Sequence, residues 1–358
     1  MNRFLLGCFV FFIALPAALS QPKSSQVDSL LSPYLGPTNP SFAVMVLKDG
    51  QPVLEKVYGY ANIEKETKAD LKTNYNLGTL SEQFVVMAAM LIQQQDKLDV
   101  KAPITDYFPD LPEYCNKVRV QHLLEHNSGL PVLSMNKFMN DFKSAEDLLN
   151  FLRGEEELMY KPGRKANWNP VNFALLAVIV NQHIESSFRK FVQNQIFEPL
   201  QMEHSAVYKE GWFTKVPNQS MGYINRQQGA FEPVELDEDS YIPGTNGIYT
   251  NLEDIPKWIH AWESDTLLTN KQLRKVQRIN FIRGQKEFLG YGWKRGFNAG
   301  SKYFYSGGIS SGNTHIMLRF PAAHYDIIML SNQASLFNLR KTAFKLLNLY
   351  TEKNYEVK

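Results

Sequence analysis

The sequence predicts an α+β protein in which one sheet is assembled from the two ends of the chain. Strand-like apolar runs occur early, at residues 41–47 and 53–60, and return late, between residues 291 and 330. From residue 79 to about residue 204 the apolar pattern changes to that of helices. Strands at both ends with helices between them indicate a single sheet and an inserted helical part.

Residues 1–20 have the pattern of a secretory signal peptide. Arg3 supplies an early positive charge, residues 4–15 are apolar, and Ala18-Leu19-Ser20 is a small-residue cleavage signal. A membrane anchor is the alternative, but the apolar run is shorter than the ~20 residues of a spanning helix and Pro16 interrupts its end. A lipid anchor at Cys8 is disfavoured because the apolar residues mostly follow the cysteine. We expect a secreted or periplasmic protein with no integral membrane segment after cleavage.

The charge balance bears on the kind of partner, and the cysteine content bears on disulfide bonds. The 38 basic and 36 acidic residues are interspersed and leave a formal charge of +2, so we expect no nucleic-acid partner. After signal cleavage only Cys115 remains, which excludes an internal disulfide; we place it in a loop after Pro112.

We expect one domain over residues 21–358, with a sheet part at about 21–76 and 245–358 and a helical part at about 77–244.

The elements follow in order from local signals. Asp49-Gly50 lies between the two early strands and predicts a β-hairpin, after which residues 60–76 are polar and predicted to be loop. An almost unbroken apolar run from Phe84 to Ile92 predicts a buried helix that begins at Thr79. Further helices are predicted at residues 120–126, 144–152, 170–183, 187–197 and 338–350.

The last part of the chain returns to strands. They are predicted at residues 291–296, 303–306, 314–320 and 326–330. Before them, Thr250-Asn251-Leu252-Glu253 has the pattern of a capping box and predicts a helix that runs toward Trp262.

Several stretches resemble one family, the serine β-lactamase and penicillin-binding-protein-like hydrolases, especially the class C β-lactamase, DD-peptidase and esterase branch. The most specific is His122-Leu123-Leu124-Glu125-His126-Asn127-Ser128-Gly129-Leu130-Pro131, which resembles the family's LLxHxSGLP segment. Other matching stretches occur in the family's order: Tyr107-Phe108-Pro109, Pro162-Gly163, Phe197-Glu198-Pro199-Leu200-Gln201-Met202, Gly247-Ile248-Tyr249-Thr250 and Gly290-Tyr291-Gly292-Trp293. The resemblance covers about residues 40–350.

The resemblance implies a mixed, mostly antiparallel sheet flanked by helices, an all-helical insertion, and a cleft between the two. It also implies three catalytic motifs: S-x-x-K, then S-x-N or Y-x-N, then K-T-G or H-x-G. The first falls on Thr79 and Glu82, and the second on Trp168 and Pro170. The third falls on Tyr305-Ser306-Gly307, where only Gly307 is unchanged.

These substitutions oppose ordinary serine chemistry. Thr79 keeps a hydroxyl, but its extra methyl group restricts χ1 and crowds attack. Glu82 places an anion where negative charge must develop; at about 4 Å and an effective dielectric constant near 20, a unit charge contributes roughly 4 kcal/mol. A reversed sign therefore costs on the order of 10³-fold in rate. Neither Trp168 nor Pro170 provides a base, and Tyr305, with an ordinary pKa of about 10, is a poor one.

The same residues can also be interpreted as residues that begin helices. Thr79-x-x-Glu82 is also a capping box, and we favour that role for both side chains. Asn169-Pro170 has the pattern of an N-cap followed by proline at the first helical position. Ser306-Gly307-Gly308 is either a carbonyl or anion cradle next to Thr79 or a glycine-rich strand end.

The leading hypothesis is a catalytically inactive or impaired homologue that keeps a ligand-binding cleft. The expected ligand is a small molecule or peptide, with cell-wall fragments among the candidates, and no cofactor is expected. The cleft residues would be Thr79, Trp168, Tyr305, Ser306, Gly307 and Gly308. The alternative is a divergent acyl hydrolase in which Thr79 attacks with help from Glu82 or Tyr305. A weaker alternative is a zinc hydrolase that uses His122 and His126 of an H-x-x-E-H pattern, although no third ligand is evident.

Overall fold

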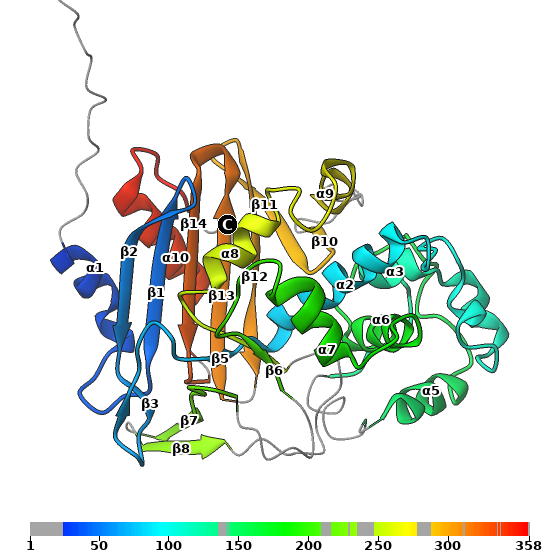
Figure 1. Ribbon diagram of the computed structural model, residues 1–358, viewed down its shortest axis with the longest axis horizontal. Coiled ribbons are helices and arrows are strands. Elements are labelled where there is room, and N and C mark those ends of the chain that lie inside the picture. The colour runs from blue at the N-terminus through cyan, green and yellow to red at the C-terminus, as the bar shows by residue number, and fades with distance from the viewer. Residues whose placement is uncertain are drawn as a thin grey trace, which may run out of the picture.

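The fold is a seven-stranded sheet covered by helices on both faces, with a cluster of helices beside it (Figure 1). A computed structural model describes residues 24–134, 142, 144–208, 216–227, 230–234, 247–277, 288–310, 312–334, 336 and 338–356. The expected signal peptide lies outside the described residues. Within them, no helix combines the length and apolar character needed to cross a membrane.

The sheet joins the two ends of the chain, as the sequence predicts. Its order is β10-β11-β12-β13-β14-β1-β2, and every neighbouring pair is antiparallel. The strands are β1 (Phe42–Lys48), β2 (Gln51–Tyr58), β10 (Phe288–Gly290), β11 (Trp293–Asn298), β12 (Ser301–Ser310), β13 (Asn313–Phe320) and β14 (Tyr325–Ser331). The predicted fold class and hairpin are confirmed.

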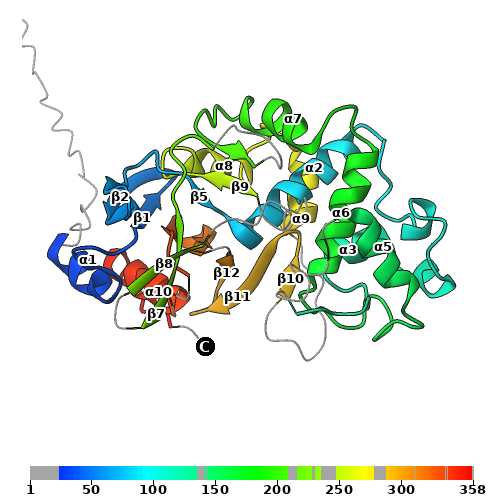
Figure 2. The same ribbon diagram turned by 90° about the horizontal axis from the view of Figure 1, so that it is seen from below.

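Alternating residues of β1 explain why both faces of the sheet are covered. Met45 and Leu47 belong to one buried cluster, whereas Val44 and Val46 belong to another. Successive side chains of a strand point to opposite faces, so a strand that is buried throughout needs a layer on each side. Figure 2 shows α1 (Ser24–Leu31) and α10 (Leu339–Tyr350) on one side, with α2 (Glu82–Gln94) and α8 (Ile255–Ala261) on the other.

The helical part packs around α2, which is buried on almost every side. The other helices of the helical part are α3 (Val120–Leu124), α5 (Ala145–Arg153), α6 (Pro170–Gln182) and α7 (Phe188–Val192). A π-helical turn at Gln193–Phe197 follows α7. The predicted helices are therefore present with ends shifted by a few residues. Phe84 of α2 stacks on Trp258 of α8 with a ring separation of 3.9 Å, so α2 joins the helical part to the sheet.

Smaller elements complete the described chain. Short strands are β3 (Tyr60–Asn62), β4 (Thr67–Lys68), β5 (Tyr75–Asn76), β6 (Ala206–Val207) and β9 (Ile248–Thr250), together with the hairpin β7 (Gly222–Gln227) and β8 (Ala230–Val234). α9 (Asn270–Gln277) precedes β10, and 3₁₀ turns occur at Ser32–Tyr34, Gly78–Ser81, Ile104–Asp106, Glu113–Lys117 and Pro321–Ala323. The prediction that residues 60–76 are only loop is wrong, because β3, β4 and β5 lie there.

Two local predictions need correction. Cys115 lies fully buried in the 3₁₀ turn Glu113–Lys117 rather than in an open loop, and burial raises its pKa to about 11. The helix after Thr250 forms, but Thr250 does not cap it. Asn251 Oδ1 instead accepts from the backbone N–H of Asp254 at 3.1 Å, while the Thr250 hydroxyl lies 2.7 Å from that of Ser205.

Candidate functional site

The site begins at the 3₁₀ turn that leads directly into α2. Asn76 Oδ1 accepts from the backbone N–H of Gly78 at 2.8 Å, and neither Leu77 nor Ser81 makes a side-chain cap. Both of these preceding residues are already in the helical region, whereas a side-chain N-cap normally requires an extended residue. The predicted Thr79-x-x-Glu82 capping box is therefore wrong, and both side chains are left for the site.

Glu82 forms a buried polar cluster instead of a cap. Trp168 Nε1 donates to Glu82 Oε1 at 3.0 Å, and His126 Nε2 lies 3.6 Å from Glu82 Oε2. The backbone N–H of Asn169 donates to His126 Nδ1 at 3.3 Å, so Nδ1 acts as an acceptor and Nε2 is the ring nitrogen that faces the carboxylate. The position of the family's lysine thus holds a carboxylate that accepts a hydrogen bond from an indole and lies beside an imidazole.

Strand β12 lies directly across from Thr79. A Cβ atom added to Gly308 would come within 2.6 Å of Thr79 Oγ1, so only glycine permits this close approach. Thr79, Glu82, His126 and Trp168 line one cavity of about 190 Å³. The remaining lining comes from the turn residue Gly292 and from the strand residues Leu289, Trp293, Lys294, Ser306, Gly307 and Gly308.

Two residues that the family motifs nominate lie away from this cavity. Tyr305 is buried on the opposite face of the sheet, where Arg340 Nη1 donates to its hydroxyl at 2.6 Å. Its neighbours Ser306 and Phe304 point to the other face because side chains alternate along a strand. The assignment of Tyr305 to the cleft, as ligand contact or as base, is thus not supported by its position.

Pro170 occupies the first turn of α6 and does not line the cavity. Asn169 Oδ1 accepts from the backbone N–H of Val171 at 3.1 Å, which confirms the predicted N-cap. Asn169 also donates through Nδ2 to the carbonyls of Leu130 and Pro131. This residue therefore ties the start of α6, and with it Trp168, to the segment that carries His126.

Sequence reasoning missed His126 and Trp293 as parts of the site. His126 had a signal, since it is the histidine of the LLxHxSGLP-like segment, but it was assigned a role only in the weaker zinc alternative. Trp293 follows the turn at Tyr291 and Gly292, whose φ angles are +56° and +75°. A Cβ on Gly292 would meet Gln83 of α2 at 2.8 Å, so this turn fits closely against the helix and sets the position of Trp293.

The described residues give no support to a zinc centre. They contain no group of three or more histidine, cysteine, aspartate or glutamate side chains arranged to hold a metal ion. His122 Nδ1 accepts from the backbone N–H of Arg119 at 3.0 Å, and burial lowers the pKa of His122 to about 4. His122 therefore acts in the start of α3, while only His126 of the pair lies at the cavity.

The cavity has several parts of a carbonyl-binding site. It offers a hydroxyl, a backbone strand edge at Gly307 and Gly308, and a flat wall from Trp168 and Trp293. Glu82 adds an acceptor and no cation. Preorganised donors stabilise an oxyanion, whereas a neighbouring carboxylate opposes it.

Comparison with known proteins decides the family. The family model described as Beta-lactamase matches residues 27–350. The chain belongs to the β-lactamase family. Within this family, the cavity at Thr79 and Gly308 lies where the resemblance implies the catalytic cleft, since it contains the positions of the first and third motifs.

Relatives of known name are distant in sequence. Protein flp of Staphylococcus aureus (strain MRSA252) is 24% identical over 327 residues, which are 88% of this chain and 64% of that protein. The chain thus spans less than two thirds of that relative. "Putative penicillin-binding protein PbpX" of Bacillus subtilis (strain 168) is 23% identical over 332 residues, covering 92% of this chain and 80% of that protein.

A solved structure supports the same fold. The octameric penicillin-binding protein homologue from Pyrococcus abyssi superposes with a TM-score of 0.79 at 22% identity. The match covers 92% of this chain and 77% of that one. At this level of identity the likeness establishes the fold, and function must be argued from the site.

Proposed function

We propose that this β-lactamase-family protein binds a ligand in the Thr79 cavity without cleaving it. The observation that carries the proposal is the position of Glu82. This residue is 5% exposed, and inside the cavity its carboxylate accepts a hydrogen bond from Trp168 and lies 3.6 Å from His126 Nε2. An acyl transfer at Thr79 would require a base and a stabilised oxyanion in the same place. The buried carboxylate cluster opposes that charge and leaves the cavity suited to recognition.

The ligand class follows from the lining. Glu82 accepts hydrogen bonds, the glycine-rich edge of β12 exposes backbone, and Trp168 and Trp293 supply flat apolar walls. These features suit a small molecule or a short peptide, and cell-wall peptides are the first candidates to test. We further propose that the protein acts outside the cytoplasm, on the strength of the signal-like residues 1–20.

An activity screen with a matched binding assay tests the proposal. The mature protein and Thr79→Ala are assayed with nitrocefin, p-nitrophenyl acetate and an acyl-D-alanyl-D-alanine peptide. We expect the two proteins to give the same background rates with all three. The peptide should still bind, as followed by NMR, and Gly308→Val should abolish binding because its side chain would occupy the space at Thr79 Oγ1.

Hydrolysis that disappears in Thr79→Ala would overturn the proposal. Peptide binding that survives Gly308→Val would place the ligand elsewhere. A circular dichroism spectrum and melting temperature like those of the parent protein show that Gly308→Val has folded, so loss of binding reports on the cavity.

A divergent acyl hydrolase is the second candidate, and one observation favours it. His126, Glu82 and Thr79 line the same cavity, so the chain retains a hydroxyl, an imidazole and a carboxylate close together. In this mechanism Thr79 attacks with help from Glu82 rather than Tyr305, which lies on the far face of the sheet. A fluorophosphonate probe should then add mass at Thr79, and Glu82→Gln should slow the labelling. Absence of labelling across pH 5 to 9 would exclude this candidate.

A further inference from the structure

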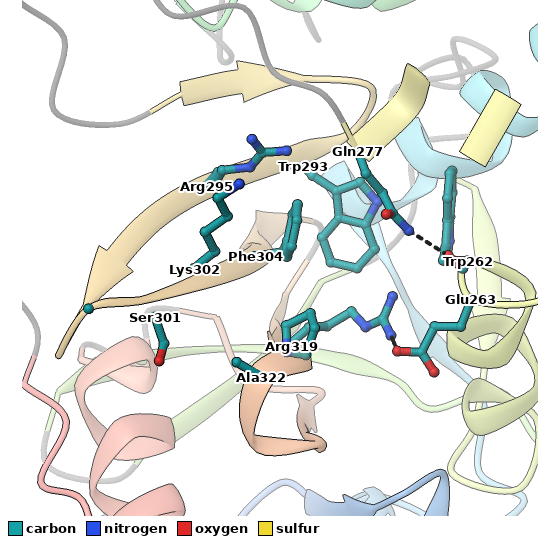
Figure 3. A pocket seen from close by; sticks show the side chains of 12 residues that line it. Trp262, Glu263, Gln277, Trp293, Arg295, Ser301, Lys302, Phe304, Arg319 and Ala322 are labelled. Carbon is teal, nitrogen blue, oxygen red and sulfur yellow. Dashed lines mark hydrogen bonds and ion pairs between the residues drawn. The ribbon is translucent and has the colours of Figure 1, made fainter. Parts of the chain in front are cut away.

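A second, larger cavity lies on the same face of the sheet, on the other side of Trp293. Its volume is about 440 Å³, and it is lined by the part of β11 and β12 that is distant from Thr79, together with residues that follow α8 (Figure 3). Trp293 also lines the Thr79 cavity, so its indole separates the two. The second cavity is in the size range of pockets that enclose small organic ligands.

Among the described residues, not every basic side chain of this cavity has an acidic partner. Arg319 is fully paired, because its Nε donates to Asp326 Oδ1 at 2.8 Å and its Nη2 contacts Glu263. Arg295 is only 8% exposed, and its buried Nε has no hydrogen-bond partner among the described residues. Within the same part of the chain, neither Arg295 nor Lys302 forms an ion pair.

A buried guanidinium whose Nε has no hydrogen-bond partner among the described residues is costly. Removing a charged group from water without compensation costs several kcal/mol, on the order of the values found for ions in protein interiors. Burial accordingly lowers the pKa of Arg295. A bound anion would compensate the charge, and a carboxylate matches the planar donor geometry of arginine.

The remaining walls are flat and apolar. Trp262 and Trp293 meet edge to face with a ring separation of 6.0 Å, and the Arg295 guanidinium lies 4.8 Å from the centre of the Phe304 ring. In Figure 3, Arg295 and Lys302 extend from neighbouring strands on one side, while Trp262 lies on the other. One end of the cavity is therefore cationic and the opposite end is aromatic.

We propose that this cavity binds an organic carboxylate with an apolar body, its carboxylate on Arg295 and Lys302 and its body against Trp293, Phe304 and Trp262. The site shares the Trp293 indole with the Thr79 cavity, but the proposal does not depend on what that cavity binds. An apolar acid rather than a polyanion fits the lining, because three aromatic side chains accompany two cations that form no ion pair among the described residues.

Calorimetric titration of the mature protein tests the charge requirement. The probes are 2-naphthoate and octanoate, each paired with its uncharged amide, 2-naphthamide and octanamide. We expect at least one of the acids to bind at least tenfold more tightly than its amide. If neither acid exceeds its amide, the proposal is wrong.

Variants place the binding at this cavity. Arg295→Met should weaken binding of the acid at least tenfold and leave the amide unchanged, whereas Arg295→Lys should retain part of the preference. Ala322→Trp, at an exposed residue that lines the cavity, should weaken the acid and the amide alike. Arg164→Met, at an exposed arginine outside the cavity, is the matched control and should bind as the parent does.

Two results would overturn the assignment. One is an Arg295→Met protein that binds the acid as tightly as the parent; the other is loss of binding in Arg164→Met as well. Arg295→Met removes a buried charge without a described partner and should fold, which its melting temperature verifies. Thr79→Ala should bind the acid normally, so failure of the proposed function at Thr79 would not affect this result.

Discussion

Gly129 shows how a single residue fixes the segment that carries His126. Its φ angle is +76°, and a Cβ atom there would collide with the carbonyl oxygen of Tyr160. Gly129→Ala should therefore lower the free energy of unfolding by about 2 kcal/mol or more, from strained backbone plus the clash. Gly163→Ala is the matched control, since Gly163 has a φ of +79° but nothing within 4 Å of the added atom. It should cost only ~1 kcal/mol.

Urea denaturation of both variants measures the difference. Equal losses in Gly129→Ala and Gly163→Ala would show that contact with Tyr160 contributes nothing, and that the left-handed backbone alone explains why glycine is required.

The hydrogen bond between Trp168 and Glu82 is a second property of single residues. Because its acceptor is a buried carboxylate, we expect a coupling free energy of about 1–2 kcal/mol between the two side chains. A double-mutant cycle with Glu82→Ala and Trp168→Phe measures this coupling from the free energies of unfolding. A coupling below about 0.3 kcal/mol would mean that the two changes are independent and that the hydrogen bond between Trp168 and Glu82 adds no stability.

At the scale of elements, the sequence predicted which helices and strands exist better than it predicted how they begin. The capping box at Thr79 failed because its assignment assumes an extended residue before the helix, and here the chain already turns as a 3₁₀ helix. The four-residue pattern from Thr79 to Glu82 does not show that a 3₁₀ turn precedes the helix. By contrast, Asn169-Pro170 was predicted correctly, since proline itself restricts the backbone at the helix start.

The sequence could predict those residues of the site that lie in or next to a family motif. Thr79, Trp168 and Ser306-Gly307-Gly308 were found through the family motifs and do meet at one cavity. The contact of Glu82 with His126 joins residues 44 positions apart and depends on how α2 packs against the helical part, which no local pattern reveals. Tyr305 was misplaced because a motif gives position along a strand, whereas the face depends on the alternation of side chains.

Strand β13 gives the protein a predicted sensitivity to acid. Burial lowers the pKa of His315 to about 3, and neither ring nitrogen has a partner among the described residues. The unfolded chain, with a pKa near 6.5, binds this proton more tightly than the folded one. Stability is therefore complete above pH 6.5 and falls by up to ~1.4 kcal/mol per pH unit as the pH drops from 6.5 toward 3.

Denaturation at pH 7, 6, 5 and 4 tests this dependence. His315→Leu should lose less stability on acidification than the parent, while His260→Gln, at an exposed histidine of α8, should follow the parent curve. Parallel curves for His315→Leu and the parent would assign the acid sensitivity to other groups, such as His122, whose pKa burial lowers to about 4.

At the scale of the whole molecule, one core extends from the sheet into the helical part. Phe84 and Phe173 of the helices belong to the same buried cluster as Met317 and Leu330 of the sheet. Phe84 is the link, since it stacks on Trp258 at 3.9 Å and meets Phe197 edge to face at 5.8 Å. A shared core implies that the two parts unfold together.

Phe84→Ala tests that cooperativity. The cavity left in α2 should cost about 3–5 kcal/mol and shift the guanidinium midpoints of tryptophan fluorescence and far-UV circular dichroism by the same amount. Phe297→Ala is the control, because Phe297 is 48% exposed on β11 and should change stability by less than about 1 kcal/mol. If only one of the two signals moved in Phe84→Ala, the helical part and the sheet would be separate folding units, and the Thr79 cavity would lie at a hinge between them rather than in one rigid body.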